Sequence, residues 1–184
     1  MNSRKDPYLI REIRFSDNRG FFAETYSRRE YLQLGIDVEF VQDNHSLSKE
    51  VGTLRGLHFQ APPNAQAKLV RCSHGAIFDV ALDIRLGSPT YGKWEGHELS
   101  ANNGYQFYIP IGFAHGFVTL EPDSEVVYKC SDYYVPESEG AILWNDPDVS
   151  IAWPRGNAPI LSEKDANAPT LTDLNTPFFF GENS

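Results

Sequence analysis

Side chains that can move protons gather around one short segment of the sequence. Arg55, His58 and Lys68 lie within fourteen residues, ahead of an alternating strand pattern. An imidazole titrates near neutral pH, so His58 can act as a general base that removes a proton from carbon. An inward-facing Lys68 can stabilise a developing enolate oxygen by about 3 kcal/mol. Both have structural alternatives: a histidine that bridges backbone groups at a strand start, and a solvated surface lysine.

Two later residues can complete an acid–base set. Asp165 can orient the imidazole, because a buried carboxylate bonded to one ring nitrogen fixes the tautomer. Ser162 and Asp165 also fit a capping box, which gives this carboxylate a structural alternative at the start of a helical turn. Tyr128, in EVVYKC, can act as an acid. Its phenol needs help to release a proton at neutral pH, and a tyrosine is otherwise simply a good strand residue.

A second imidazole comes from another apolar stretch. His115 lies in YIPIGFAHGFV, which reads as a strand after the turn at Asn102–Gly104. In residues 78–85 (FDVALDIR) apolar and polar side chains alternate strictly, as in a strand with two different faces. We expect the wall that carries His58 and the wall that carries His115 to face each other across a pocket.

The two histidines raise the question of a metal. The metal-binding members of the cupin superfamily resemble G-x5-H-x-H-x3-4-E followed by P-x-G-x-x-H. Residues 110–115 (PIGFAH) fit the second part, but Gln60 stands where the first part needs its second imidazole, and no glutamate follows at the required spacing. Two imidazoles without a carboxylate fall short of a typical metal site. We therefore expect no metal.

Charge and composition limit the classes of ligand. The net charge of −9 argues against general nucleic-acid binding, which needs a basic surface. It allows one phosphorylated ligand, because a pocket can be locally positive on an acidic protein. Arg19, Arg55 and Lys164 are candidates for a diphosphate, since cationic side chains pair with phosphate oxygens.

The 184 residues fit one domain, 1–184, that can bury a substantial core. Short strands separated by Gly, Pro and Asn turns predict a mainly β fold, a jelly roll or barrel with a few short peripheral helices. Ser27, Glu30 and Gly35 predict a capped and terminated helix over 27–35. Strands are expected at 8–15, 21–26 and 38–48, and a helical turn at 161–166.

Two cysteines, Cys72 and Cys130, are too few for a disulfide framework and indicate free thiols. The N-terminus has no apolar signal-peptide core, and no stretch is long enough to span a bilayer. We expect a cytoplasmic protein that binds neither membranes nor nucleic acid.

Many motifs taken together resemble one family. In order along the chain they are RGFFAETY, FVQDNHS, LRGLHFQ, AQAKLVR, DVALDIRLGSPTYGKW, IPIGFAHGFVTL, SEGAILWNDP and LSEKDANAP. They look like the motifs of the dTDP-4-dehydrorhamnose 3,5-epimerase family, from about Asp17 to Pro169. The resemblance implies a cupin-type jelly-roll barrel that assembles as a homodimer.

The resemblance also assigns roles to residues of this sequence. The base falls on His58, its supporting carboxylate on Asp165, the acid on Tyr128 and the enolate-stabilising group on Lys68. His115 is expected close to the sugar, with Asp79 as its partner. The tyrosine that stacks on thymine falls on Tyr134, in preference to Tyr133. The remaining nucleotide contacts fall on Arg19, Glu24, Gln42, Asn44, Arg55, Glu139 and Lys164.

The activity implied is the conversion of dTDP-4-dehydro-6-deoxy-D-glucose to dTDP-4-dehydro-L-rhamnose. The C4 ketone acidifies the hydrogens at C3 and C5, so both centres can be inverted without a cofactor. Three alternatives remain open: a relative that inverts one centre only, a non-catalytic sugar-nucleotide-binding jelly roll, and a metal-dependent cupin oxygenase.

Overall fold

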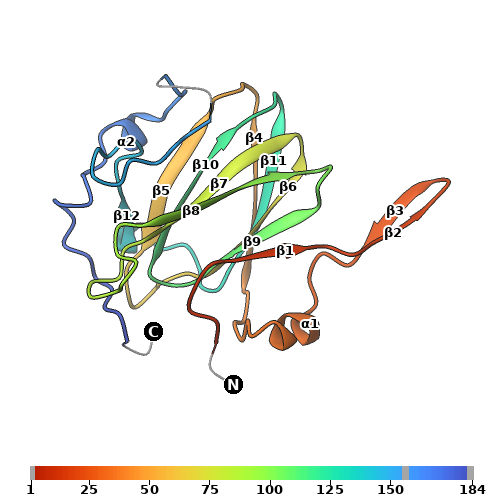
Figure 1. Cartoon of the computed structure of the whole chain (residues 1–184), viewed down its shortest axis with the longest axis horizontal. Helices are drawn as coiled ribbons and strands as arrows, with labels where there is room; N and C mark the ends of the chain where they lie inside the picture. The colour runs from red at the N-terminus through yellow and green to blue at the C-terminus, as the bar shows by residue number, and fades with distance from the viewer. Residues whose placement is uncertain (1–2, 155–157, 182–184) are drawn as a thin grey trace.

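Two five-stranded antiparallel sheets face each other and form the body of the protein (Figure 1). The structure is a computed structural model that describes residues 3–154 and 158–181. The first sheet contains, in spatial order, β1 (Tyr8–Arg11), β9 (Tyr105–Ile109), β6 (Lys68–His74), β11 (Ser124–Cys130) and β4 (Gln42–Ser48). The second contains β12 (Glu139–Ala141), β5 (Leu54–Gln60), β10 (Phe113–Thr119), β7 (Ala76–Asp83) and β8 (Trp94–Ser100).

A dry core fills one part of the space between the sheets. Buried side chains from both sheets meet there: Val70, Cys72, Phe107, Ile109 and Val126 from the first, and Ile77, Ala81, Leu99, Phe113 and Phe117 from the second. Burial of apolar area of this kind is the main stabilising contribution to the fold. The prediction of a mainly β fold is confirmed.

β7 covers residues 76–83, so the predicted strand over 78–85 is confirmed as far as Asp83, and its two faces have different environments. Val80 and Leu82 point away from the space between the sheets and pack beneath a C-terminal layer that includes Leu171 and Phe178. Asp79 belongs to the opposite face and bonds to a side chain of the pocket. Asp79 therefore belongs to the interior of the barrel, and part of the opposite, apolar face of β7 is covered by the C-terminal layer.

The helices are short and peripheral, as predicted. Helix α1 (Arg28–Gln33) ends before Gly35, whose φ of +80° suits glycine. The predicted capping box is wrong in its contacts, because the Ser27 side chain makes no capping hydrogen bond. A 3-10 turn, η1, covers Pro136–Ser138, and α2 covers Glu163–Ala166. In α2 the Ser162 side chain does accept a hydrogen bond from the Asp165 backbone N–H, at 3.1 Å.

Three predicted strands are shorter than expected. Residues 8–15 divide into β1 and β2 (Arg14–Asp17), and residues 21–26 contribute only β3 (Gly20–Ala23). Within 38–48 the strand begins at Gln42, because Val38 and Phe40 pack instead against the cluster around α1. The apolar pattern of these segments was correct, but tertiary packing decided where the ladders begin and end.

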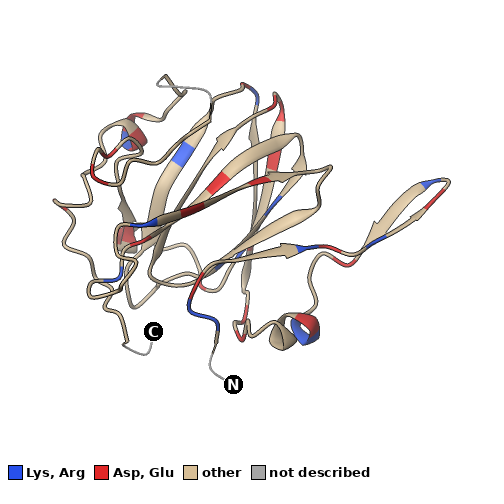
Figure 2. Ribbon diagram, viewed as in Figure 1, with Lys and Arg blue, Asp and Glu red and all other residues tan. Residues whose placement is uncertain are grey.

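Strands β2 and β3 form a two-stranded hairpin that projects away from the barrel (Figure 1). The hairpin carries charges of both signs (Figure 2). It also exposes large apolar side chains: Phe15 is 65% exposed, Phe21 56% and Phe22 70%. This part of the chain therefore has no core of its own.

Two glycines allow β5 and β10 to approach closely beside the two histidines. The register between these strands shifts between His115 and Phe117. A Cβ added to Gly56, whose φ is +120°, would lie 2.5 Å from the Gly116 Cα. Gly116 directly follows His115, and Gly56 lies two residues before His58.

We expect Gly56→Ala to destabilise the fold, because it adds about 1–3 kcal/mol of overpacking to the strain of a positive φ. Gly87→Ala is the matched control, since Gly87 has a φ of +84° but nothing within 4 Å of the added methyl. Urea unfolding of both variants measures the difference. Equal losses of unfolding free energy would contradict the close approach of the two strands.

Candidate active site

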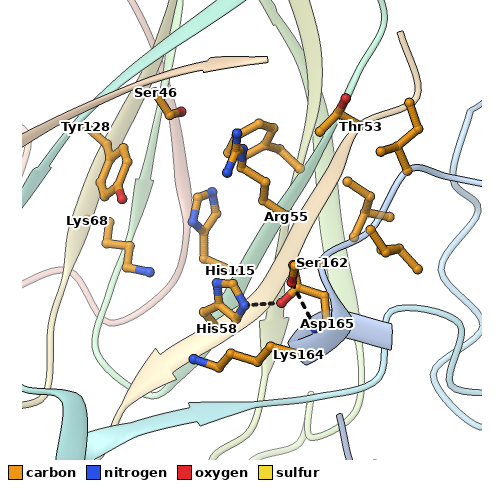
Figure 3. Close-up of a pocket in the computed structure, with 14 residues that line it drawn as sticks. Ser46, Thr53, Arg55, His58, Lys68, His115, Tyr128, Ser162, Lys164 and Asp165 are labelled. Atoms are coloured by element: carbon orange, nitrogen blue, oxygen red, sulfur yellow. Dashed lines mark hydrogen bonds and ion pairs between the residues drawn. The ribbon is translucent and has the colours of Figure 1, made fainter. Parts of the chain in front are cut away.

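The predicted acid–base residues line one cavity of about 470 Å³ between the sheets (Figure 3). Its polar lining includes Ser46, Arg55, His58, Lys68, His115, Tyr128, Lys164 and Asp165. A second hollow of about 270 Å³ shares His58, Lys68 and Tyr128 with it and adds Gln42, Asn44, Tyr134 and Glu139. The two hollows are therefore neighbours, and these three shared side chains lie at the boundary between them.

His58 and Asp165 are in direct contact, although 107 residues separate them in the sequence. His58 Nε2 lies 2.6 Å from Asp165 Oδ1. An ionised carboxylate can only accept a hydrogen bond, so Nε2 carries the proton and Nδ1 keeps its lone pair. The imidazole is half-buried and lines the cavity. The predicted contact between these two side chains is therefore present, and the carboxylate fixes which ring nitrogen donates to it.

Asp165 makes both of the contacts that its sequence position suggested. Its backbone N–H bonds to Ser162, and its buried carboxylate bonds to His58. Burial alone would raise the pKa of this carboxyl, but the hydrogen bond and charge of His58 outweigh it and hold the pKa below its usual range. The carboxylate therefore stays ionised and continues to accept the hydrogen bond from the imidazole.

A second imidazole–carboxylate pair lies beside the first. His115 Nε2 is 2.8 Å from Asp79 Oδ1, as expected from the resemblance, and both side chains are buried. Burial lowers the pKa of His115 against the opposing effect of Asp79, so this imidazole is neutral. The prediction that the two histidine walls face each other is wrong. His58 and His115 are directly paired on neighbouring antiparallel strands of one sheet.

The facing wall comes from the other sheet. Lys68 on β6 and Tyr128 on β11 line the pocket opposite the histidines (Figure 3). Burial lowers the pKa of Lys68 and raises the pKa of Tyr128. An imidazole and a phenol thus flank the same cavity from opposite sheets, which is the arrangement that proton transfer on two faces of a ring requires.

Residues expected to hold a nucleotide cluster at the rim. Tyr134 donates a hydrogen bond to Glu139 at 2.8 Å, and Lys164 forms an ion pair with Glu139 at 2.5 Å. Burial favours a raised pKa for Glu139, but these two partners hold it below the usual value. Arg55 donates from Nε to Ser48 and from Nη2 to the Leu47 carbonyl. Cationic side chains and an exposed tyrosine ring are therefore available at the entrance.

Two predicted nucleotide contacts lie elsewhere. Arg19 is in the turn of the β2–β3 hairpin and bonds to Asp17, while Glu24 directly follows β3. Neither lines the pocket of its own chain. The hairpin leaves the barrel (Figure 1), so the fold does not bring these two residues to the other eleven predicted site residues.

Gln60, which stands where the metal motif has its second histidine, stabilises a loop instead. Gln60 donates hydrogen bonds to the carbonyls of Asn64 and Tyr133 and accepts one from the Val135 N–H, at 2.7 to 3.1 Å. It thereby fixes the loop that carries Tyr134. Sequence reasoning treated Gln60 only as a missing ligand. A buried glutamine inside an apolar strand was the available signal, because such a side chain must find hydrogen-bond partners.

Ser46 was also missed, although it lies on the pocket wall. In QDNHSLS the alternate residues Gln42, Asn44, Ser46 and Ser48 face inward and are all polar, which could have indicated a polar pocket wall. Within residues 3–154 and 158–181, no group of three His, Cys, Asp or Glu side chains is arranged to hold a metal ion. The expectation that the site holds no metal therefore stays a prediction.

Comparison with known proteins identifies the family. The sequence pattern of dTDP-4-dehydrorhamnose 3,5-epimerase matches residues 3–173. The chain is 58% identical over 167 residues to the enzyme of that name from Salmonella typhimurium, covering 90% of this chain and 91% of that protein. The chain belongs to the dTDP-4-dehydrorhamnose 3,5-epimerase family. It is an enzyme with the cupin-type fold of that family.

Two solved structures illustrate the range of relatives. An epimerase from Legionella pneumophila, in complex with dTDP-4-keto-L-rhamnose, is 47% identical with a TM-score of 0.88, covering 95% of this chain and 93% of that one. A 3'-monoepimerase from Streptomyces bikiniensis, in complex with dTDP-quinovose, is 36% identical with a TM-score of 0.85, covering 94% and 88%. The fold is thus shared by enzymes described as acting at one or two centres.

We expect Asp165→Asn to change the protonated nitrogen of His58, because an amide can donate to Nε2 and so favour the wrong tautomer. The ¹⁵N shifts of the labelled imidazole report this directly. Ser162→Ala is the control: it removes the cap, at a cost of about 1 kcal/mol in unfolding free energy, and should leave the tautomer unchanged. An unaltered spectrum in Asp165→Asn would show that the carboxylate does not determine which nitrogen of His58 is protonated.

Proposed function

We propose that this protein epimerises dTDP-4-dehydro-6-deoxy-D-glucose at C3 and C5 to give dTDP-4-dehydro-L-rhamnose. The observation that carries the proposal is the placement of the His58–Asp165 pair and Tyr128 on opposite walls of one cavity. Family membership and the identity to enzymes of this name support it.

The proposed mechanism assigns one step to each group. His58 takes a carbon-bound proton through Nδ1, while Asp165 stabilises the resulting imidazolium. Lys68 steadies the enolate oxygen formed from the C4 ketone. Tyr128 returns a proton from the other face, which inverts the centre. The C4 ketone makes both adjacent positions acidic, so the same set can act at C5 and C3, and we expect no cofactor.

Inversion of one centre only is the second candidate. The 3'-monoepimerase from Streptomyces bikiniensis has a similar fold, which keeps this reading open. The higher identity to 3,5-epimerases favours inversion at both centres. Proton NMR of the product formed in heavy water distinguishes the two.

We expect His58→Ala to abolish solvent deuterium incorporation at both carbons, because the variant lacks the base. Tyr128→Phe should lower product formation more than it lowers exchange, with a loss of about 100- to 10,000-fold, since abstraction can still occur. NMR in heavy water with the keto-sugar nucleotide measures exchange and inversion together. Substantial exchange at either carbon in His58→Ala would show that His58 is not the base. An undiminished product yield in Tyr128→Phe would show that Tyr128 is not the acid.

We further propose a homodimer in which the hairpin of one copy reaches the pocket of the other. Three observations support this: Arg19 and Glu24 lie outside their own pocket, the hairpin projects from the barrel, and its phenylalanines are exposed. Burying those rings against a second copy would remove apolar area from water.

Mixing two inactive variants tests the exchange of hairpins. His58→Ala and Arg19→Ala, unfolded and refolded together, should form hybrid dimers with one intact pocket, because that pocket receives His58 from one chain and Arg19 from the other. Activity well above that of either variant refolded alone is the expected result. If hybrid dimers are detected by mass spectrometry but activity does not recover, Arg19 acts in the pocket of its own chain.

We propose that the chain forms a single domain over 1–184 and works in the cytoplasm. Both cysteines of the chain are buried and free, as expected for a reducing compartment. In the part of the chain that the structure describes, no helix has the length and apolar character needed to cross a bilayer.

A further inference from the structure

The loop that carries Tyr134 is attached to the barrel by side chains rather than by its own backbone. In the described part of the chain, no backbone–backbone hydrogen bond involves residues 132–134. The Tyr134 side chain is 54% exposed and is bonded through its hydroxyl to Glu139. A surface loop without ladder bonds is ordinarily mobile. The position of this ring therefore depends on the side chains that bond to the loop backbone.

Side-chain amides of three glutamines bond to four consecutive backbone groups of this loop. The bonds are Gln66 to the Asp132 carbonyl at 2.7 Å, Gln60 to the Tyr133 carbonyl at 3.1 Å, Gln42 to the Tyr134 N–H at 3.0 Å and Gln60 to the Val135 N–H at 2.7 Å. We call these three glutamines the amide clamp. All three also line the smaller hollow, as Tyr134 does.

Gln60 is the central member of the amide clamp and is only 4% exposed. A primary amide has two hydrogens to donate. Gln60 gives both to backbone carbonyls, of Asn64 and Tyr133, and its oxygen accepts from the Val135 N–H. It has no donor left for a bound molecule. Any effect of Gln60 on a ligand must therefore be exerted through the loop.

The amide clamp joins the loop to the segments that carry two of the proton-transfer groups. Gln60 follows His58 by two residues in β5, and alternate residues of a strand share a face. Gln66 lies two residues before Lys68, just ahead of β6. Movement of the loop relative to either segment would break these bonds. The tyrosine is thus held at a set position relative to the base and the lysine.

We propose that the amide clamp, with Gln60 at its centre, positions the Tyr134 ring to stack on the thymine and so strengthens nucleotide binding. The inference rests on the proposed function, in which the substrate is a thymidine diphosphate sugar. A mobile loop would have to be ordered each time the base binds, and that ordering would weaken the affinity. The amide clamp orders the loop in advance. Gln60 is therefore a positioning residue that acts through Tyr134.

Calorimetry with dTDP measures the effect. Gln60→Met keeps a side chain of similar length but removes the amide, and we expect dTDP to bind about fivefold to fiftyfold more weakly. Gln66→Met removes a single bond to the loop and should weaken binding about twofold to fivefold. Circular dichroism checks that each variant is folded. If Gln60→Met does not fold, Gln66→Met carries the same comparison.

Asn103→Leu is the matched control. Asn103 holds another turn in the same manner: its amide donates to the Glu98 carbonyl and accepts from the N–H groups of Ser100 and Tyr105, at 2.9 to 3.0 Å. It lines neither hollow. The substitution removes as many bonds to a turn as Gln60→Met does, and we expect the dTDP affinity to change less than about twofold.

A double-mutant cycle separates positioning of the ring from a general structural defect. Tyr134→Ala should itself weaken dTDP binding about tenfold to a hundredfold, because it removes the stacking surface. In that background the further change to Gln60→Met should alter the affinity less than about twofold, since there is no ring left to position. A defect of the whole fold would instead lower the affinity equally in both backgrounds.

Each of the other results overturns a specific claim. Equal dTDP affinity in Gln60→Met and the unchanged protein overturns the inference and leaves the proposed function intact. So does an undiminished loss in the Tyr134→Ala background, and so does a Tyr134→Ala variant that binds dTDP as well as the unchanged protein. Failure of the unchanged protein to bind dTDP would overturn the proposed function itself, and this inference with it.

Discussion

The hydrogen bond between His58 and Asp165 is the contact on which the site depends. It joins a strand of the barrel to a four-residue helix that covers one end of it. A free imidazole exchanges its proton between two nitrogens, whereas this one is held in a single tautomer by an ionised partner. The carboxylate is buried, and the contact lowers its pKa, so Asp165 stays ionised and continues to accept the hydrogen bond from the ring.

The space between the two sheets has two parts with different side chains. One part is a dry core built from both sheets, and the other is a pocket lined by charged and polar groups. The cost of burying these groups is limited by pairing: Asp79 with His115, Asp165 with His58, and Glu139 with Lys164 and Tyr134. The rigidity of the packed part keeps the two walls of the pocket at a fixed separation.

Strand alternation and motif order made much of this arrangement predictable. The β class, the buried pairs His58–Asp165 and His115–Asp79, and the rim residues followed from them. The relative position of the histidines did not, because the pairing of β5 with β10 is a long-range choice that no local pattern encodes. The ends of β1 and β4 and the contacts of Ser27 were decided by packing and by geometry that a capping motif alone cannot fix.

The stretch that carries α2 lies between two points where the chain bonds to neighbouring backbone. Before it, Ile160 N–H donates to the Gly52 carbonyl and Leu54 N–H donates to the Ile160 carbonyl; after it, Leu143 N–H donates to the Pro169 carbonyl. A segment held this way can detach at a free-energy cost well below that of melting the sheets. Detachment would release the base from its partner while the barrel stays folded. Heating or mild denaturant should therefore abolish enzymatic activity before the circular dichroism signal of the β-sheets changes.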